Sequence, residues 1–84
     1  MKRTKRIHSI LEEHILNFDI QIIDNSQLHR GHNNFNGEGE THITINLQNN
    51  SDSKINRLEI HRRINFLLKK EFYTGLHSLE IKIN

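Results

Sequence analysis

The chain of 84 residues contains no cysteine and no proline, and only four of its residues are glycine. Without cysteine, disulfides cannot cross-link the fold, and no thiolate is present to bind a metal or to attack a substrate. No stretch approaches the roughly 20 apolar residues that a membrane-spanning helix needs, and no apolar segment of a secretory signal follows the basic start. These absences favour a small cytoplasmic protein that has no contact with a membrane.

The composition is that of a folded domain with a small core, because 33% of the residues are hydrophobic. A chain of this length buries only roughly 60% of the surface that its unfolded form exposes, so we expect one compact domain over residues 1–84. The formal net charge is +2, and much of the excess lies in the first six residues, at Lys2, Arg3, Lys5 and Arg6. A basic arm can bind phosphates, but we favour a solvated helix start.

Two segments have apolar residues at the three- and four-residue spacing of an amphipathic helix. The first helix is expected over about residues 3–16 and the second helical region over residues 55–72. Asn56 and Glu59 have the spacing of a capping box, which indicates a separate helical start there. The second helical region is therefore expected to be broken in two.

Three segments alternate apolar and polar residues, which is the period of a half-buried strand. They cover residues 18–23, 41–47 and 78–83. A long polar stretch joins the first two strands, which predicts an antiparallel hairpin. The order is α-β-β-α-β, and a helix layer on one face of a three-stranded mixed sheet would bury every apolar stripe. The predicted fold class is α+β.

The seven histidines are the richest chemical feature of the chain. His29 and His32 lie in the long polar stretch, and His77 lies at the start of the last strand. Neutral imidazole binds zinc and iron well, so a loop histidine and His77 would together supply two of the four ligands that a metal site usually needs. From spacing alone we favour a polar surface loop for His29 and His32. His77 shares the parity of Leu79 and Ile81, so a buried histidine bonded to the backbone is the alternative for it.

The remaining histidines are expected to have no metal-binding role. His61 follows an apolar helix position and is interpreted as structural, whereas His8, His14 and His42 are interpreted as solvated or cap-like.

An enzyme is not predicted, because the chain has no G-x-S-x-G elbow, no phosphate loop and no H-E-x-x-H motif. Asp24 and Ser26 near His29 have the atom types of a catalytic triad, but we expect them to form local turn hydrogen bonds. A zinc-dependent enzyme built on His29, His32 and His77 is the weakest alternative.

Four motifs occur in an order that resembles the BolA-like family over nearly the whole chain. Residues 24–32 (DNSQLHRGH) look like the D-E-S-x-x-H-x-G-H loop of that family, and residues 39–43 (GETHI) look like its G-E-T-H-F strand entry. Residues 61–65 (HRRIN) look like part of its R-H-R helix, and residues 76–81 (LHSLEI) look like its closing H-A-L-x-I strand. Each motif is short, but four in order are specific.

The resemblance implies an α-β-β-α-α-β fold related to class II KH domains. It also implies a non-enzymatic protein that shares a glutathione-ligated [2Fe–2S] cluster with a monothiol glutaredoxin and is monomeric and cluster-free when isolated. In that family the closing-strand histidine is a cluster ligand, assisted by a loop histidine or cysteine, so His77 inherits this role here with either His29 or His32. Counting forward from Ser26 favours His29, and counting back from Thr41 favours His32.

The alternative function is a nucleic-acid-binding transcriptional regulator, which some members of the family are held to be, with DNA as a partner. A KH domain clamps RNA with a G-x-x-G loop, which this chain lacks between its helices. The chain also departs from the family at Ile60, in place of the first Arg of R-H-R, and at the polar residues 50–54, in place of an F-x-G stretch. The basic residues proposed for this alternative are Arg57, Arg62, Arg63, Lys69 and Lys70.

Overall fold

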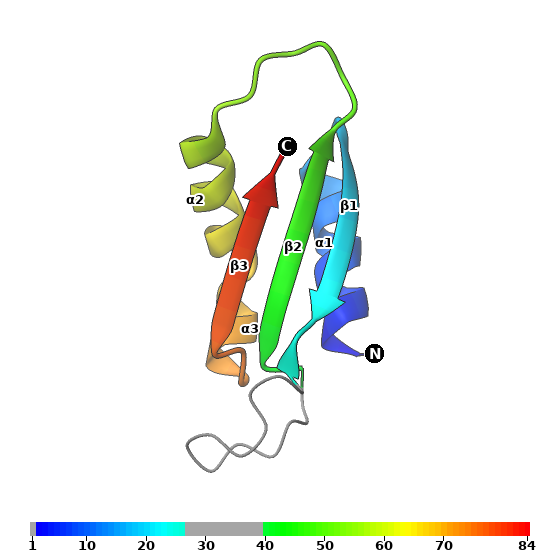
Figure 1. Cartoon of the computed structure of the whole chain (residues 1–84). Helices are drawn as coiled ribbons and strands as arrows, with labels where there is room; N and C mark the ends of the chain where they lie inside the picture. Colours follow the sequence, from blue (N-terminus) through cyan, green and yellow to red (C-terminus); the bar gives the residue numbers. More distant parts are fainter. Residues whose placement is uncertain (1, 27–39) are drawn as a thin grey trace.

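The computed structural model describes residues 2–26 and 40–84, so His29 and His32 lie outside the described residues. The elements follow the predicted α-β-β-α-α-β order (Figure 1). They are α1 (Arg3–His14), β1 (Phe18–Asp24), β2 (His42–Asn49), α2 (Arg57–Leu67), α3 (Lys69–Tyr73) and β3 (Ser78–Ile83). Within the described parts of the chain, none of the helices is long and apolar enough to cross a membrane.

The sheet has the order β1-β2-β3, with β1 antiparallel to β2 and β2 parallel to β3. His42 is opposite Ser78 at one end of the sheet, and Leu47 is opposite Ile83 at the other. All three helices lie against the same face of the sheet (Figure 1). The predicted α+β fold with an antiparallel hairpin and a mixed sheet is therefore confirmed.

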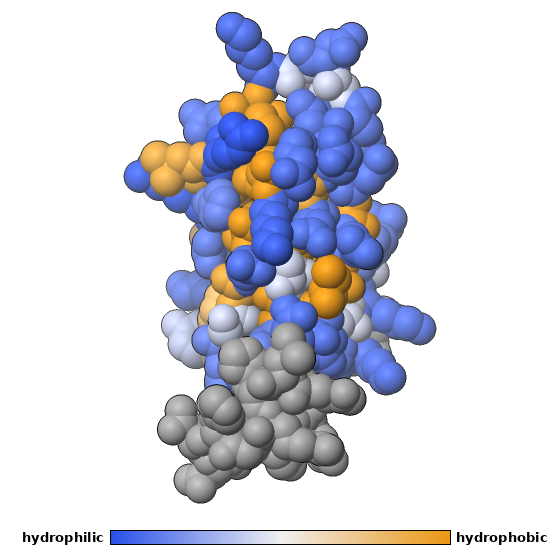
Figure 2. Space-filling view, in the orientation of Figure 1, coloured by the Kyte–Doolittle hydropathy of each residue, from blue (hydrophilic) through white to orange (hydrophobic). Residues whose placement is uncertain are grey.

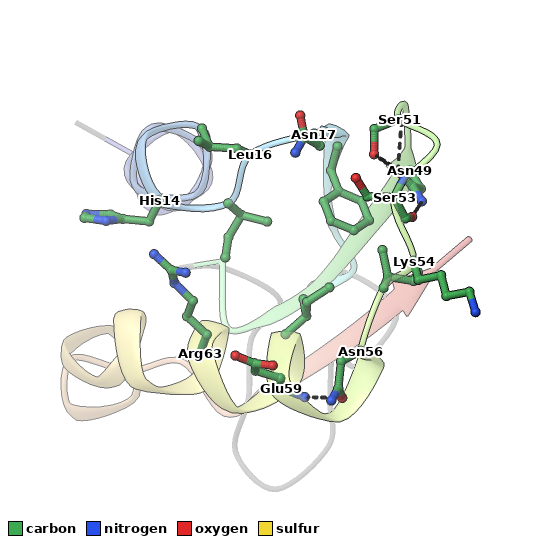
Figure 3. Close-up of a pocket in the computed structure, with 14 residues that line it drawn as sticks. His14, Leu16, Asn17, Asn49, Ser51, Ser53, Lys54, Asn56, Glu59 and Arg63 are labelled. Carbon is green, nitrogen blue, oxygen red and sulfur yellow. Dashed lines mark hydrogen bonds between the residues drawn. The ribbon is translucent and has the colours of Figure 1, made fainter.

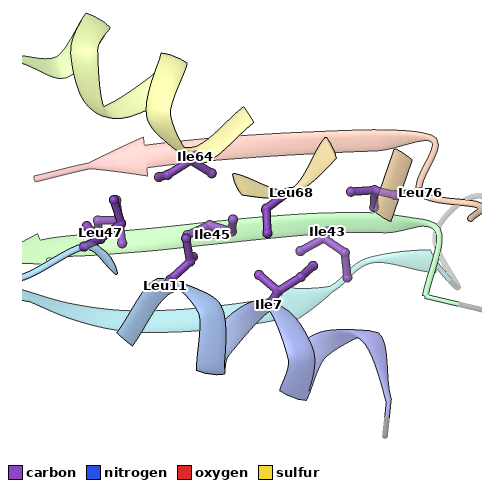
Figure 4. Packing of buried hydrophobic residues seen from close by; sticks show 9 residues of the cluster. Ile7, Leu11, Ile43, Ile45, Leu47, Ile64, Leu68 and Leu76 are labelled. Carbon is purple, nitrogen blue, oxygen red and sulfur yellow. The ribbon is translucent and has the colours of Figure 1, made fainter. Parts of the chain in front are cut away.

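The core lies between the central strand and the helices (Figure 4). Every other residue of β2 points into it, because side chains alternate between the two faces of a strand. Burying one such aliphatic side chain stabilises the folded state by about 1.5–3 kcal/mol relative to leaving it exposed to water. The buried residues are Ile7 and Leu11 of α1, Ile43, Ile45 and Leu47 of β2, Ile64 and Leu68 of the second helical region, and Leu76 before β3, with Ile15 after α1.

The opposite face of the sheet is polar. Thr44 donates a hydrogen bond to Glu80 on β3 at 3.2 Å, and Asn46 donates one to Gln21 on β1 at 3.2 Å. Figure 2 shows hydrophilic residues over much of this side of the molecule, with hydrophobic residues visible between them. The alternation predicted for β2 therefore places its apolar side chains in the core and its polar side chains on the other face, where Thr44 is only 5% exposed.

The second helical region is divided in two as expected, but the break lies at Leu68 and not near residue 56, where α2 begins. Asn56 is the N-cap of α2, and its side chain accepts a hydrogen bond from the Glu59 N–H at 3.1 Å. Leu68 separates α2 from α3 with φ −98° and ψ 13°, outside the range of a regular α-helix. Its side chain is fully buried, so the helices pack on both sides of an anchored break.

Candidate histidine site

Three of the four sequence motifs meet at one end of the sheet. β1 ends there, because Asp24 pairs with Ile43, and β2 and β3 both begin there, because His42 pairs with Ser78. We call this region, which consists of residues 24–26, 40–42 and 76–78, the histidine end.

His77 is exposed to solvent at the histidine end. Its backbone N–H donates to the Thr41 carbonyl at 2.8 Å, and the Ser78 N–H donates to the same oxygen at 3.1 Å. The alternative of a buried His77 is therefore wrong. His77 does not follow the alternation of Leu79 and Ile81, because β3 begins only at Ser78 and His77 precedes it.

His42 lies beside His77, with ring centroids 5.9 Å apart and ring planes at 77°. The Nδ1 atom of His42 is 2.9 Å from Thr41 Oγ1. The interpretation of His42 as solvated or cap-like was wrong, since its side chain is half-buried and contacts a second imidazole. The signal was present in the sequence: both histidines stand at the start of a predicted strand, and parallel neighbours bring their first residues together.

Asp24 and Ser26 form the hydrogen-bonded turn that was predicted for them. The Ser26 N–H and Oγ both donate to Asp24 Oδ1, at 2.9 and 2.5 Å. Ser26 Oγ also accepts a hydrogen bond from the Thr41 N–H at 2.8 Å, and Ser26 is only 1% exposed. The turn therefore fixes the start of β2, including the residue whose carbonyl holds His77.

A buried ion cluster lies beside the histidine end. Arg3 Nε is 2.9 Å from Glu71 Oε1, and Arg6 Nη2 is 2.8 Å from the same oxygen. The hydrogen bond from Arg6 lowers the pKa of Glu71, and the bond from Arg3 adds to this against the opposing effect of burial. Arg3 was expected in a solvated helix start, but it is only 8% exposed because Glu71 compensates its charge.

Glu40 caps α1 from a distant part of the chain. Its carboxylate accepts hydrogen bonds from the N–H groups of Arg3 at 3.2 Å and Thr4 at 3.0 Å, and the residue before the helix supplies no side-chain cap. Burial would raise the pKa of Glu40, but the bonds from Thr4 and Arg3 outweigh it, so the pKa is lower than usual. A carboxylate also suits the positive end of the helix dipole.

The described residues contain no group of three or more histidine, cysteine, aspartate or glutamate side chains that could hold a metal ion. His42 and His77 are the two imidazoles that the described part of the histidine end brings together. The predicted pairing of His77 with His29 or His32 involves residues outside the described ranges and stays a prediction.

The basic residues proposed for nucleic acid are all exposed and lie on α2 and α3. Arg62, Phe66, Lys69 and Tyr73 follow one another at spacings of four, three and four residues on α2 and α3. Phe66 is 75% exposed and Tyr73 is 78% exposed. Neither aromatic residue was predicted from the sequence to belong to this surface. The full basic set is Arg57, Arg62, Arg63, Lys69 and Lys70, all exposed.

A pocket of about 220 Å³ lies at the end of the molecule away from His77. Figure 3 shows His14 on one side of it and Glu59 and Arg63 of α2 on the other. Phe18 and Asn49, which also line it, are paired at the far end of the β1–β2 ladder. This pocket contains neither His42 nor His77, so it is separate from the histidine end.

Comparisons with known proteins agree with this architecture. The family model described as BolA-like protein matches residues 11–84. A Sinorhizobium protein described as an uncharacterized protein in the cobS 5'region is 34% identical over 83 residues, which cover 98% of this chain and 89% of that protein. Protein BOLA1, chloroplastic, of Arabidopsis thaliana is 31% identical over 81 residues, which cover 94% of this chain and 51% of that protein.

Two solved structures have the same fold. BolA1 from Arabidopsis thaliana matches with a TM-score of 0.79 at 29% identity, and the match covers 100% of this chain and 92% of that chain. The BolA domain of SufE1 from Arabidopsis thaliana matches with a TM-score of 0.78 at 30% identity, with the same coverage of both chains. Together with the family model, these matches show that the chain belongs to the BolA-like protein family.

Proposed function

We propose that this protein is a non-enzymatic partner of a monothiol glutaredoxin and supplies histidine ligands to a glutathione-bound [2Fe–2S] cluster, for cluster trafficking or for redox and iron sensing. The observation that carries the proposal is the exposed imidazole of His77 on a fixed backbone at the histidine end. Ser26 and Glu40, which flank the segment that contains His29 and His32, lie at the same end. Their position supports a loop histidine as the second ligand.

The donor set fits a shared cluster. The chain has no cysteine, so the thiolates would come from glutathione and from the partner. His77 would bind iron together with His29 or His32, while the bond from its N–H to Thr41 holds its backbone in place. Replacing thiolate by neutral imidazole lowers the negative charge of the cluster, which raises its reduction potential as in Rieske centres.

The test is a titration of a [2Fe–2S]-loaded monothiol glutaredoxin with this protein, followed by visible absorption and circular dichroism. The wild type should change the spectrum up to saturation, and His77→Ala should abolish the change. His29→Ala and His32→Ala, measured separately and together, identify the loop ligand. His61→Ala is the matched control on α2 and should behave as wild type. A wild-type titration that leaves the spectrum unchanged would refute the proposal.

A second candidate function is the binding of single-stranded nucleic acid by α2 and α3. It is favoured by the exposure of Phe66, which lies between Arg62 and Lys69, and of Tyr73, which follows Lys69 by four residues. Stacking of a base on an aromatic side chain contributes about 1–3 kcal/mol, and neighbouring cations bind the phosphates.

Fluorescence anisotropy with a labelled single-stranded DNA tests this candidate at several salt concentrations. The double variant Phe66→Ala/Tyr73→Ala should weaken binding at every salt concentration. The control is Leu58→Ala, which removes another exposed apolar side chain from α2. If the double variant binds as tightly as wild type, the binding is only electrostatic and this candidate function is wrong.

A further inference from the structure

The buried guanidinium of Arg3 connects the two chain segments that meet at His77. Its Nη1 donates to the carbonyl of Glu40 at 3.1 Å, and its Nη2 donates to the carbonyl of Thr74 at 2.7 Å. Its Nε bonds to Glu71 at 2.9 Å, which compensates the charge. Each nitrogen of the guanidinium therefore has a defined acceptor, a planar fork geometry that a lysine cannot reproduce.

On the β2 side, Arg3 and Ser26 hold the same peptide group. The carbonyl of the Glu40–Thr41 peptide accepts from Arg3, and its N–H donates to Ser26 Oγ. Glu40 has φ +50°, a conformation that is unfavourable for a residue with a side chain. The carbonyl of Thr41, which follows directly, accepts from the His77 N–H. Arg3 thus binds the peptide group that directly precedes the Thr41 carbonyl, and that carbonyl accepts the hydrogen bond from His77.

On the α3 side, Arg3 holds the turn that leads into His77. Thr74 accepts from Arg3 three residues before His77, and Gly75 follows with φ +121°, which favours glycine. A Cβ atom at Gly75 would lie 3.4 Å from Arg3 Nη2. The turn and the guanidinium are therefore packed together, and a change in either one alters the path of the chain into His77.

We infer that Arg3 is a positioning residue for His77, and that its guanidinium sets where the imidazole stands by joining the Glu40–Thr41 peptide to the Thr74–Gly75 turn. The inference rests on the proposed function, since His77 is the cluster ligand there. Arg3 lies before residues 11–84, which the family model matches, so the family match does not include this residue. Arg3 touches neither partner nor cluster in this scheme and acts only through His77.

If Arg3 only stabilised the fold, its replacement would increase amide hydrogen exchange by the same factor throughout the domain. The test therefore compares the exchange of amides near His77 with that of an amide in the core. Amide hydrogen exchange is measured by NMR on wild type, Arg3→Lys and Leu47→Val. Arg3→Lys keeps the positive charge that pairs with Glu71. It removes the two guanidinium nitrogens that donate to the carbonyls of Glu40 and Thr74. Leu47→Val destabilises the core at the far end of β2 and is the matched control (Figure 4).

In Arg3→Lys, exchange of the His77 and Ser78 amides should increase at least about tenfold more than exchange of the Ile45 amide, because hydrogen bonds from a charged donor are lost at this site. In Leu47→Val, all three amides should change by a common factor. An equal change of the three amides in Arg3→Lys would overturn the inference. Gly75→Ala, which strains the turn at φ +121° and leaves the guanidinium in place, should increase exchange of the same two amides.

The same variants are titrated into the [2Fe–2S]-loaded monothiol glutaredoxin under conditions in which each is fully folded. Arg3→Lys should weaken the interaction at least about tenfold, and Leu47→Val should leave it unchanged. Unchanged cluster affinity in Arg3→Lys would overturn the positioning role. If wild type itself fails to alter the cluster spectrum, the proposed function fails, and the exchange measurement still decides whether Arg3 holds His77.

Discussion

Replacing Glu71 by glutamine keeps the shape of the side chain and removes the negative charge that faces Arg3 and Arg6. Glu71 is only 5% exposed, and the guanidinium of Arg3 beside it is buried as well. Removing one partner of a buried ion pair costs about 3–5 kcal/mol, because the other charge is left without compensation. Arg6 is half exposed and adds little to this cost, since water screens its charge. The free energy of unfolding of an 84-residue domain is about 4–13 kcal/mol, so the loss is a large share of it.

Urea denaturation followed by circular dichroism measures this effect. With a slope of about 1 kcal/mol per molar urea for a small domain, the midpoint of Glu71→Gln should fall by about 3 M or more. Glu80→Gln is the matched control, because it removes the same charge from an exposed side chain 3.8 Å from Lys82. This control should cost less than about 1 kcal/mol. Equal midpoints for the two variants would refute the assignment of Glu71 as the buried counter-charge of Arg3.

Three further predictions concern stability. The pKa values of Glu40 and Glu71 are lowered in the folded protein. The stability that these carboxylates contribute is therefore present above the unfolded carboxyl pKa of about 4.3, and it is lost as the pH falls through their folded pKa values. A urea midpoint that is constant from pH 7 to pH 3 would contradict this. Asn56→Ala should cost about 1 kcal/mol, because the cap of the Glu59 N–H is lost, and chemical denaturation would show it. Ile45→Ala should cost about 2–5 kcal/mol in the same assay, since it opens a cavity at the centre of the core; a loss below 1 kcal/mol would show that the core collapses around the smaller residue.

The elements of the fold were predictable because they depend on local patterns. Residues 41–47 alternate apolar and polar side chains because helices cover only one face of the strand that they form. Successive side chains of a strand point to opposite faces, so this pattern predicts the strand directly. The start of α2 was predictable from Asn56 and Glu59, whose capping interaction spans only three residues. The position of the break at Leu68 was not, because no local signal marks it. The parallel pairing of β2 with β3 follows once a helix layer on one face is assumed, because a helical crossover joins the two strands.

The ion cluster was not predictable from local patterns. Arg3 and Glu71 are separated by 68 residues, and each lies in a charged stretch that is typical of a solvated helix surface. Only the packing of α1 against α3 buries both, and the sequence has no periodic signal for that contact. A lone acidic residue beside Lys69 and Lys70 therefore gave no reason to expect a buried carboxylate. The burial of Arg3 depends on tertiary structure alone.

The motif resemblance named residues that the fold brings to one end of the sheet, but it did not separate those that hold the backbone from those that carry an imidazole. In the G-E-T-H motif, the side chain of Glu40 caps α1 and the backbone of Thr41 holds Ser26 and His77, whereas only His42 brings an imidazole to the site. A substitution at Glu40 should therefore act through the stability of α1. A substitution at the exposed His77 should leave stability within about 0.5 kcal/mol of wild type, and under the proposed function it should weaken only the binding of the cluster. Two neighbouring motifs at this end of the sheet are thus expected to differ in what their residues do. Measuring both the free energy of unfolding and the cluster affinity of each variant distinguishes them, and neither measurement does so by itself.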